Sequence, residues 1–291
     1  MSGRDVAGAP RPVPAGLTFV SVPIGNARDV TLRALDVLAG AEVLAAEDTR
    51  ALRRLMEIHA IPLNGRRVRA YHDANGARAR PALLAALAEG RSVAYASEAG
   101  TPLLADPGFV LAREAIAAGH PVTAAPGPSA LTAALAVGGL ASDRLLFAGF
   151  PPPSAGARAA WLRGLDAAAA TVAIYESPRR VRRLLDEMRG THGEGRRVAL
   201  CRELTKRFEE VLRGTIAEVS DALTEDPRGE VVLLVERPGE APPAGDLDTL
   251  LSAAMARVRL KEAVAEVAAV TGRPRRDVYA AALALKGAGD G

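Results

Sequence analysis

Short apolar runs alternate with helical periodicity along the first half of the chain. The runs predict strands at residues 17–22, 42–46, 68–71, 92–97 and 121–125. Apolar residues at helical spacing between them predict helices at residues 29–39, 49–59, 77–88 and 109–118. Strands that alternate with helices pair in parallel through right-handed crossovers, so the pattern predicts a parallel sheet covered by helices.

A second group of alternating elements follows a stretch rich in glycine and proline. Residues 138–153 interrupt both periods, and we expect them to link two domains. Beyond them the pattern predicts helices at 158–165 and 178–188, strands at 171–175, 197–201 and 230–236, and a hairpin partner at 208–213. The expected fold class is α/β, with two α/β domains over residues 15–137 and 138–237.

The two ends of the chain differ from this pattern. Residues 1–14 hold prolines and charges without the apolar stretch of a signal peptide, and we expect a disordered leader. After the proline-rich residues 238–245, helical spacing at 247–257, 260–270 and 274–285 predicts a small C-terminal helical domain over 246–291. Residues 257–286 carry seven basic and three acidic side chains, a net charge of +4. This tail could grip RNA or extend a dimer interface.

Composition narrows the class of protein. Apolar residues make up 49% and charged residues 24%, as in ordinary globular proteins, and a net charge of +3 permits a nucleic-acid partner without requiring one. The single cysteine excludes a disulfide framework, and four histidines without ligand spacing predict no metal site. No apolar run approaches the roughly 18 residues of a membrane helix. We expect a cytoplasmic protein without a membrane partner.

Two loops of small residues and proline follow predicted strands of the first domain. One is Ser97-Glu98-Ala99-Gly100-Thr101-Pro102 and the other is Pro126-Gly127-Pro128-Ser129-Ala130. Ligands bind outside the carboxyl ends of parallel strands, and glycines there let a ligand approach the backbone. The phosphate-binding motifs G-x-G-x-x-G and G-x-x-x-x-G-K-[ST] are missing, so the loops suit adenosine and an amino-acid group better. We expect the strands before these two loops to be adjacent in the sheet. Two such loops side by side indicate a ligand site rather than two tight turns without a ligand.

Three polar clusters have two interpretations each. Glu47 and Asp48 could serve catalysis, or a carboxylate there could cap the next helix. His72 and Asp73 are flanked by arginines and could hold an acidic backbone or lie on a solvated face. The alternating charges at 202–206 could contact a substrate or form a surface ladder of ion pairs.

Seven ordered segments together resemble a known family. They are VPIGN at 22–26, AAEDTR at 45–50, AGTP at 99–102, PGPSA at 126–130, YESP at 175–178, RELTK at 202–206 and GEV at 229–231. This set is similar to the tetrapyrrole (corrin/porphyrin) methylase superfamily, in its branch that acts on ribosomal RNA. The resemblance covers residues 17–236, and the tail fits it too.

The resemblance implies an activity, a cofactor and partners. It implies two α/β domains with S-adenosyl-L-methionine folded into the cleft between them, and a homodimer without a metal. The expected reaction is 2′-O-methylation of a cytidine in the decoding region of small-subunit (16S) ribosomal RNA, within the assembled small ribosomal subunit. The residues expected to bind the cofactor are Pro23, Gly25, Ala99, Gly100, Thr101, Pro102, Asp106, Pro126, Gly127, Pro128, Ser129, Ala130, Tyr175, Glu176, Gly229 and Glu230.

A ribose hydroxyl is a poor nucleophile, so a positioned carboxylate or lysine could lower the barrier to transfer. The candidates are Glu47, Asp48, Glu98, Glu203 and Lys206. We expect Glu98 or Glu47 in this role, with Arg50, Arg202 and Lys206 on RNA phosphates. The family usually has Asp at position 98 and Glu at position 76, where this chain has Gly76, which we expect mainly to cap a helix. Two alternatives stay open: methylation of a tetrapyrrole precursor, and a non-enzymatic RNA-binding module that retains a cofactor pocket.

Overall fold

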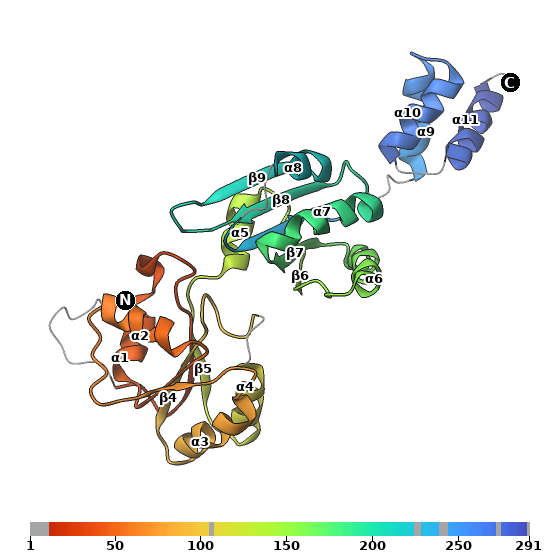
Figure 1. The fold of residues 1–291 in the computed structure, drawn as a ribbon. Coiled ribbons are helices and arrows are strands. Elements are labelled where there is room, and N and C mark those ends of the chain that lie inside the picture. Colours follow the sequence, from red (N-terminus) through yellow and green to blue (C-terminus); the bar gives the residue numbers. More distant parts are fainter. Residues whose placement is uncertain (1–11, 105–107, 224–227, 239–243, 272–274, 290–291) are drawn as a thin grey trace. The chain divides into compact units, whose positions relative to one another are not determined.

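The computed structural model describes residues 12–104, 108–223, 228–238, 244–271 and 275–289 (Figure 1). The chain divides into two compact units, Met1–Arg237 and Pro238–Gly291. The first unit contains two five-stranded sheets, and the second is helical. Among the described residues, no helix has the length and apolar character needed to cross a membrane. The expected leader falls mostly on residues 1–11, outside the described residues, and its boundary stays a prediction.

The first sheet and its helices follow the predicted alternation. In chain order the elements are β1 (Gly16–Val20), η1 (Ala27–Asp29), α1 (Leu32–Gly40), β2 (Val43–Ala46), α2 (Thr49–Ile58), β3 (Val68–Ala70), α3 (Gly76–Ala88), β4 (Ser92–Ala96), α4 (Gly108–Ala117) and β5 (Val122–Ala125). The helix expected from residue 29 begins three residues later, because Thr31 accepts a hydrogen bond from the N–H of Ala34 and caps α1.

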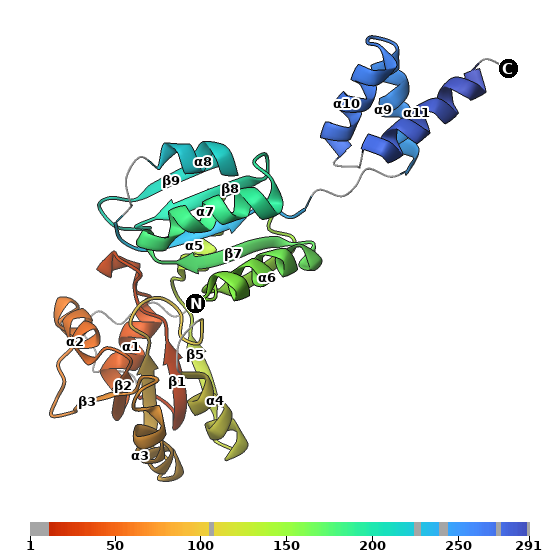
Figure 2. The ribbon, with the colours of Figure 1, turned by 45° about the vertical axis from the view of Figure 1, so that its right-hand side comes forward.

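All strand pairs of this sheet are parallel, as predicted. Successive strand residues alternate between its two faces: Leu44 packs with α1 and α2, and Val43 packs with α3 and α4 (Figures 1 and 2). The strand order is β3-β2-β4-β1-β5. The two small-residue loops follow β4 and β5. We expected these strands to be adjacent, and this expectation is wrong because β1 lies between them.

The second sheet has the order β6-β7-β10-β8-β9. Its elements are β6 (Leu145–Gly149), α6 (Ala155–Leu165), η2 (Asp166–Ala168), β7 (Thr171–Glu176), α7 (Pro178–His192), β8 (Arg197–Arg202), β9 (Glu210–Thr215), α8 (Ile216–Ala222) and β10 (Val231–Val235). Only β6 and β7 pair in parallel; the predicted hairpin of β8 and β9 is confirmed as antiparallel. Helices α6, α7 and α8 pack on one face.

The opposite face of the second sheet is covered by α5 (Ala130–Gly138), a helix that we did not predict. The segment 138–153, expected to link two domains, contains β6, a strand that we did not predict. The apolar run of this strand, Leu145 to Phe147, is short. The glycines and prolines that flank it are typical of loops, so the run was not recognised as a strand.

The second unit is a bundle of α9 (Ala244–Met255), α10 (Leu260–Thr271) and α11 (Arg275–Gly289). Its core includes Leu251, Ala263, Val278 and Ala282, all buried. These observations confirm the α/β fold class with a C-terminal helical part, while the domain boundaries at residues 137 and 246 stay predictions.

Candidate active site

A cavity of about 340 Å³ lies where the loops of the first sheet meet strands of the second. The loops after β1, β4 and β5 form one wall, and β7, β8 and β10 with their flanking residues form the other. The lining residues are Ile24, Ala99, Gly100, Thr101, Leu104, Ser129, Ala130, Phe150, Tyr175, Glu176, Ser177, Pro178, Cys201, Leu204, Gly229, Glu230, Val231 and Val232. The site therefore lies at the carboxyl ends of parallel strands, where such sheets bind ligands.

Backbone pairing fixes the loop that follows β4. Val22 and Gly100 exchange hydrogen bonds in both directions, with N–O distances of 2.9 and 3.0 Å. The hydroxyl of Ser97 donates to the carbonyl of Gly100 at 3.0 Å. Gly100 has φ +74, and a Cβ at this residue would lie 3.1 Å from the Ile24 side chain. A side chain here would be strained and would push into the cavity wall.

A chain of hydroxyl groups joins the loops after β1, β4 and β5. Ser21 Oγ donates to Thr101 Oγ1 at 3.1 Å, and Thr101 Oγ1 donates to the carbonyl of Pro128 at 2.9 Å. A Cβ on Gly127 would lie 2.9 Å from the Cβ of Ser21, closer than real contacts allow. The glycine is needed because the loops pass so near each other.

Ser129 places a buried hydroxyl in the cavity, close to the hydroxyl of Tyr175. Its Oγ is buried and has no hydrogen-bond partner among the described residues. The residue precedes α5 as its N-cap, but its side chain does not cap the helix. The hydroxyl and the first N–H groups of a helix together offer donors to a carboxylate or hydroxyl of a ligand.

The two predicted catalytic carboxylates lie on neighbouring loops. Glu47 follows β2, and its Oε2 accepts a hydrogen bond from the N–H of Glu98 at 3.1 Å. Glu98 follows β4 and is exposed, directly before the cavity residues Ala99 and Gly100. The structure therefore brings both residues to the edge of the cavity, with Glu47 holding the loop that carries Glu98. Asp48 caps α2 through the N–H groups of Arg50 and Ala51, so capping is the confirmed interpretation for it.

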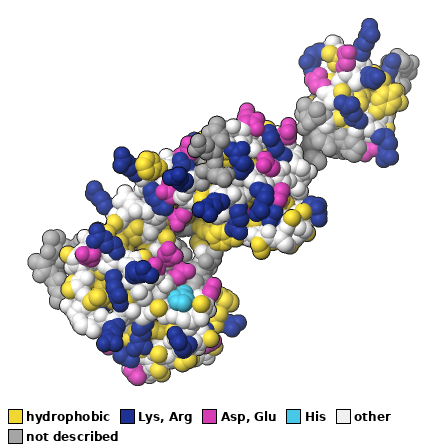
Figure 3. All heavy atoms as spheres, in the orientation of Figure 1, with side chains coloured by type: hydrophobic (Ala, Val, Ile, Leu, Met, Phe, Trp, Pro, Cys, Tyr) yellow, Lys and Arg dark blue, Asp and Glu magenta, His cyan; other side chains and the backbone are white. Residues whose placement is uncertain are grey.

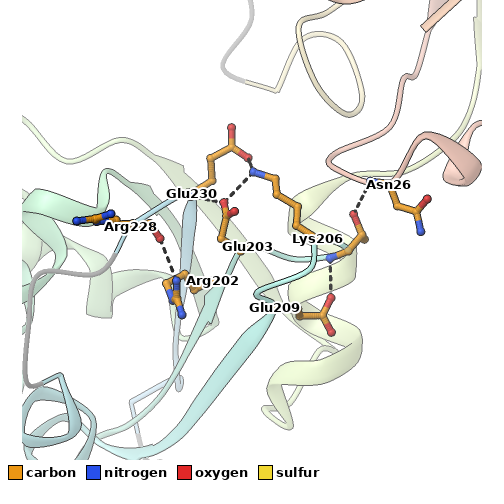
Figure 4. A network of polar contacts seen from close by, with 8 residues as sticks. Asn26, Arg202, Glu203, Lys206, Glu209, Arg228 and Glu230 are labelled. Atoms are coloured by element: carbon orange, nitrogen blue, oxygen red, sulfur yellow. Dashed lines mark hydrogen bonds and ion pairs between the residues drawn. The ribbon is translucent and has the colours of Figure 1, made fainter. Parts of the chain in front are cut away.

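A carboxylate–ammonium network stands beside the second wall (Figure 4). Lys206 Nζ lies 2.8 Å from Glu203 Oε1 and 3.0 Å from Glu230 Oε2. The hydrogen bond with Lys206 lowers the pKa of Glu203. Burial lowers the pKa of Lys206, but its bonds to Glu203 and Glu230 raise that pKa above its ordinary value. Lys206 is thus a fully charged cation between two carboxylates.

The same network touches the loop that follows β1. Thr205 Oγ1 accepts a hydrogen bond from the N–H of Asn26 at 3.1 Å. A Cβ on Gly25 would lie 2.4 Å from Lys206 Cγ, and a Cβ on Gly229 would lie 2.2 Å from the carboxylate of Glu203. Neighbouring side chains approach both backbones so closely that only glycine fits at these two predicted cofactor positions.

Tyr175 and Cys201 are two of the four titratable residues that line the cavity from the second sheet. Burial raises the pKa of the Tyr175 hydroxyl. Burial also raises the pKa of the Cys201 thiol from 9.0 to about 11. Neither Tyr175 nor Cys201 ionises near neutral pH, so the charged groups of this wall are Glu176 and Glu230. Buried Glu176 is paired with Arg180, at 2.7 Å between Oε1 and Nη2.

We expect Cys201 to resist thiol reagents in the folded protein. The thiolate is the reactive form, and a pKa raised from 9.0 to about 11 reduces its population by roughly a hundredfold at pH 8. The rate of reaction with Ellman's reagent measures the reactivity of Cys201 alone, because the chain has one cysteine. Reaction in the native state as fast as in urea would contradict the burial.

The same shift gives stability a pH dependence of known sign. Above pH 9 the unfolded thiol loses its proton before the folded one, so the free energy of unfolding falls as the pH rises toward 11. The slope is at most about 1.4 kcal/mol per pH unit. Cys201→Ala should remove this part of the slope in urea titrations.

The predicted site residues divide into two groups. Nine line the cavity: Ala99, Gly100, Thr101, Ser129, Ala130, Tyr175, Glu176, Gly229 and Glu230. Six others belong to the same loops but are not among the lining residues: Pro23, Gly25, Pro102, Pro126, Gly127 and Pro128. Asp106 lies outside the described residues.

Two of the three predicted phosphate contacts are engaged in ion pairs within the protein. Arg50 is exposed at the start of α2. Arg202 pairs with Glu210 at 3.0 Å and donates to the carbonyl of Arg228. Lys206 is occupied by Glu203 and Glu230. The ladder of ion pairs is thus observed for residues 202–206, and their contact with RNA stays a prediction.

Sequence analysis missed the apolar part of the lining. Ile24, Leu204 and Val231 stand inside the quoted motifs and could have been included; Leu104, Phe150, Cys201 and Val232 carried no local signal. In the part of the chain that the structure describes, no group of three His, Cys, Asp or Glu side chains is arranged to hold a metal ion.

Comparisons with known proteins agree with this geometry. A family model described as Tetrapyrrole (Corrin/Porphyrin) Methylases matches residues 16–220, and one described as RsmI C-terminal HTH domain matches residues 241–286. Among solved structures, the methyltransferase CobJ has a TM-score of 0.59 at 22% identity, covering 77% of this chain and 94% of that one. Diphthine synthase has a TM-score of 0.58 at 14% identity, covering 76% and 89%. At these identities the structures show the fold alone.

Curated relatives are closer in sequence. A protein of Mesorhizobium japonicum named Ribosomal RNA small subunit methyltransferase I is 44% identical over 97% of both chains. Proteins of the same name are 39% identical in Mycobacterium tuberculosis, over 92% of this chain and 94% of that one, and in Escherichia coli O157:H7, over 93% and 96%. The chain belongs to the tetrapyrrole methylase family and, within it, to the group of proteins named ribosomal RNA small subunit methyltransferase I.

Proposed function

We propose that this protein binds S-adenosyl-L-methionine in the cavity and methylates the ribose 2′-oxygen of a cytidine in the decoding region of 16S ribosomal RNA. The observation that carries the proposal is the cavity itself, because its walls are formed by the motif loops after β1, β4 and β5 and by the motif ends of β7 and β10. Relatives named for this RNA cover nearly the whole chain, which favours RNA over a tetrapyrrole as the acceptor.

The residues of the cavity fit this cofactor. Ile24, Leu204 and Val232 supply apolar surface for a purine ring. Ser129 Oγ, buried and without a partner among the described residues, is a donor or acceptor for the amino-acid group or the ribose. Glu230 at the cavity supplies negative charge for a cationic ligand. When bound, S-adenosyl-L-methionine supplies a methyl group already activated by its sulfonium.

The protein then has to orient the ribose and remove its proton. We assign proton removal to Glu98, because it is exposed at the edge of the cavity and its loop is held by Glu47. Glu47 is assigned a positioning role through the N–H of Glu98. Arg50 and Arg202 are assigned to phosphates along the RNA backbone. Lys206 is assigned to holding the cavity wall, since both of its carboxylate partners already neutralise it.

A transfer assay with two acceptors and a blank tests the proposal. The protein is incubated with methyl-labelled S-adenosyl-L-methionine and either small ribosomal subunits lacking the modification, a corrin precursor, or buffer. We expect label in the RNA only. Label in the corrin precursor would overturn the choice of acceptor. Cofactor binding by calorimetry without transfer to either acceptor would support a non-enzymatic RNA-binding module instead.

Two further properties belong to the proposal. We propose that the protein acts in the cytoplasm as a homodimer, without a metal; α4 exposes Phe109 and Ile116, 60% and 62% accessible, which a second copy could cover. Light scattering gives the mass in solution directly. We also propose that the basic helical unit contacts RNA, because the matching family model is described as a helix-turn-helix domain.

A further inference from the structure

Phe150 is a large aromatic residue exposed at the cavity. It lines the cavity, yet 54% of its surface is accessible. The chain contains five phenylalanines, so aromatic residues are scarce. A large aromatic side chain that is more than half exposed at the cavity indicates a contact with something that enters from outside.

The backbone directs Phe150 toward the cavity. The register of β6 against β7 shifts between Phe147 and Gly149, which marks a β-bulge. Gly149 has φ +66, in the left-handed region that favours glycine. Such a bulge at the end of a strand turns the chain and aims the next side chain away from the sheet.

Further contacts hold the ring in place. Its centroid lies 5.9 Å from that of Tyr175, with an angle of 68° between the planes, and Tyr175 in turn packs against Phe147 at 4.8 Å. The prolines that follow Phe150 are pinned by the buried guanidinium of Arg158, which donates to the carbonyls of Pro152 and Pro153 at 3.0 and 2.9 Å. The ring is thus preorganised while part of its surface stays free.

Positive charge lies on the helix whose first residue lines the same cavity as Phe150. Pro178, the first residue of α7, lines the same cavity, and α7 continues with arginines at 179, 180, 182 and 183. Figure 3 shows basic side chains gathered over the part of the molecule where Figure 1 places α7. Arg179 and Arg183 are exposed and one turn apart, so they share one face of the helix. An exposed aromatic ring at a cavity, with a basic helix that begins at the same cavity, is a combination suited to single-stranded nucleic acid.

We propose that Phe150 is the platform on which the base of the acceptor nucleotide stacks, unpaired from the RNA, while α7 holds the adjoining phosphates. This inference rests on the proposed function, and it names the part of the site that takes the acceptor. A stacked base would hold its ribose at the cavity, where the methyl group is delivered. Phe150 is therefore a substrate-binding residue, separate from the cofactor contacts.

The test compares Phe150→Ala, Phe150→Trp and the control Phe208→Ala. Phe208 is 65% exposed and does not line the cavity. We expect Phe150→Ala to raise the KM for small subunits about tenfold or more, with the Kd for S-adenosyl-L-methionine within twofold of the unsubstituted protein. Phe150→Trp should restore most of the loss because it keeps a stacking surface. Phe208→Ala should change neither constant.

Three results would contradict the stacking of a base on Phe150. A weaker cofactor Kd with an unchanged KM for RNA would show that Phe150 covers the cofactor, and no change in either constant would show that it contacts neither; both results overturn the proposal. Equal losses in the Trp and Ala variants would also contradict stacking. If the unsubstituted protein does not label small subunits at all, the proposed function itself fails, and this inference falls with it. Urea midpoints check that each variant is folded.

Discussion

Replacement of Glu98 by glutamine is expected to lower the rate of methyl transfer about a hundredfold. Glutamine has nearly the same size as glutamate but cannot accept the ribose proton. Glu98 is exposed beside the cavity rather than in its lining, so the affinity for S-adenosyl-L-methionine should not change. Single-turnover assays with saturating cofactor measure the chemical step, and calorimetry measures the cofactor Kd.

Two controls make this result interpretable. Glu98→Asp keeps the carboxylate and restores the residue usual in the family, so it should retain most of the activity. Glu57→Gln removes an exposed carboxylate of α2, 70% accessible, and should have no effect. Full activity of Glu98→Gln would exclude Glu98 as the proton acceptor and turn attention to Glu47, the neighbouring carboxylate.

Replacement of Arg158 by methionine is expected to lower the free energy of unfolding by about 3 kcal/mol. The side chain of Arg158 is 3% exposed and is paired with Glu187 through Nε and Nη2. It also donates to the carbonyls of Pro152 and Pro153. Methionine fills part of the volume but leaves a partly buried carboxylate and two carbonyls without their donor.

A surface ion pair serves as the matched control for Arg158. Arg54 and Glu57 lie 2.7 Å apart but are 68% and 70% exposed, so Arg54→Met should cost at most about 0.5 kcal/mol. The pH dependence of the free energy of unfolding provides a second check. Arg158 lowers the pKa of Glu187 below its ordinary 4.5, so the stabilisation is complete above that pH and is lost as the pH falls further.

The difference between the unsubstituted protein and Arg158→Met should therefore shrink in acid. Urea unfolding at pH 7 and at pH 3 measures both values. Equal losses for Arg158→Met and Arg54→Met at pH 7 would contradict the structural role of the buried pair. Because Arg158 also holds the loop after Phe150, the methionine variant should raise the KM for RNA as well.

Much of the first domain could be predicted because its signals are local. Apolar runs, helical periodicity and the cap at Asp48 each depend on a few neighbouring residues. The loops after β4 and β5 were found through their glycines, and the structure shows why Gly100 and Gly127 are needed: a positive φ in one and a close contact with Ser21 in the other.

The rest depends on contacts between distant residues. The insertion of β1 between β4 and β5, and the antiparallel pairing of β10 with β7 and β8, follow from the packing of the whole unit. The short α8 did carry a signal, since Thr215 and Glu218 form a capping box that sequence analysis passed over. Phe150 and Cys201 became site residues only through the second sheet.

The position of the methyl group in the RNA is the most direct test of the proposed function. Small subunits lacking the modification are incubated with the protein and methyl-labelled S-adenosyl-L-methionine, and the RNA is then digested to nucleosides and separated. We expect the label to comigrate with 2′-O-methylcytidine, and to be absent when Glu98→Gln replaces the unsubstituted protein at short times. Label on a base, or none in the RNA although the cofactor binds, would contradict the proposed ribose methylation.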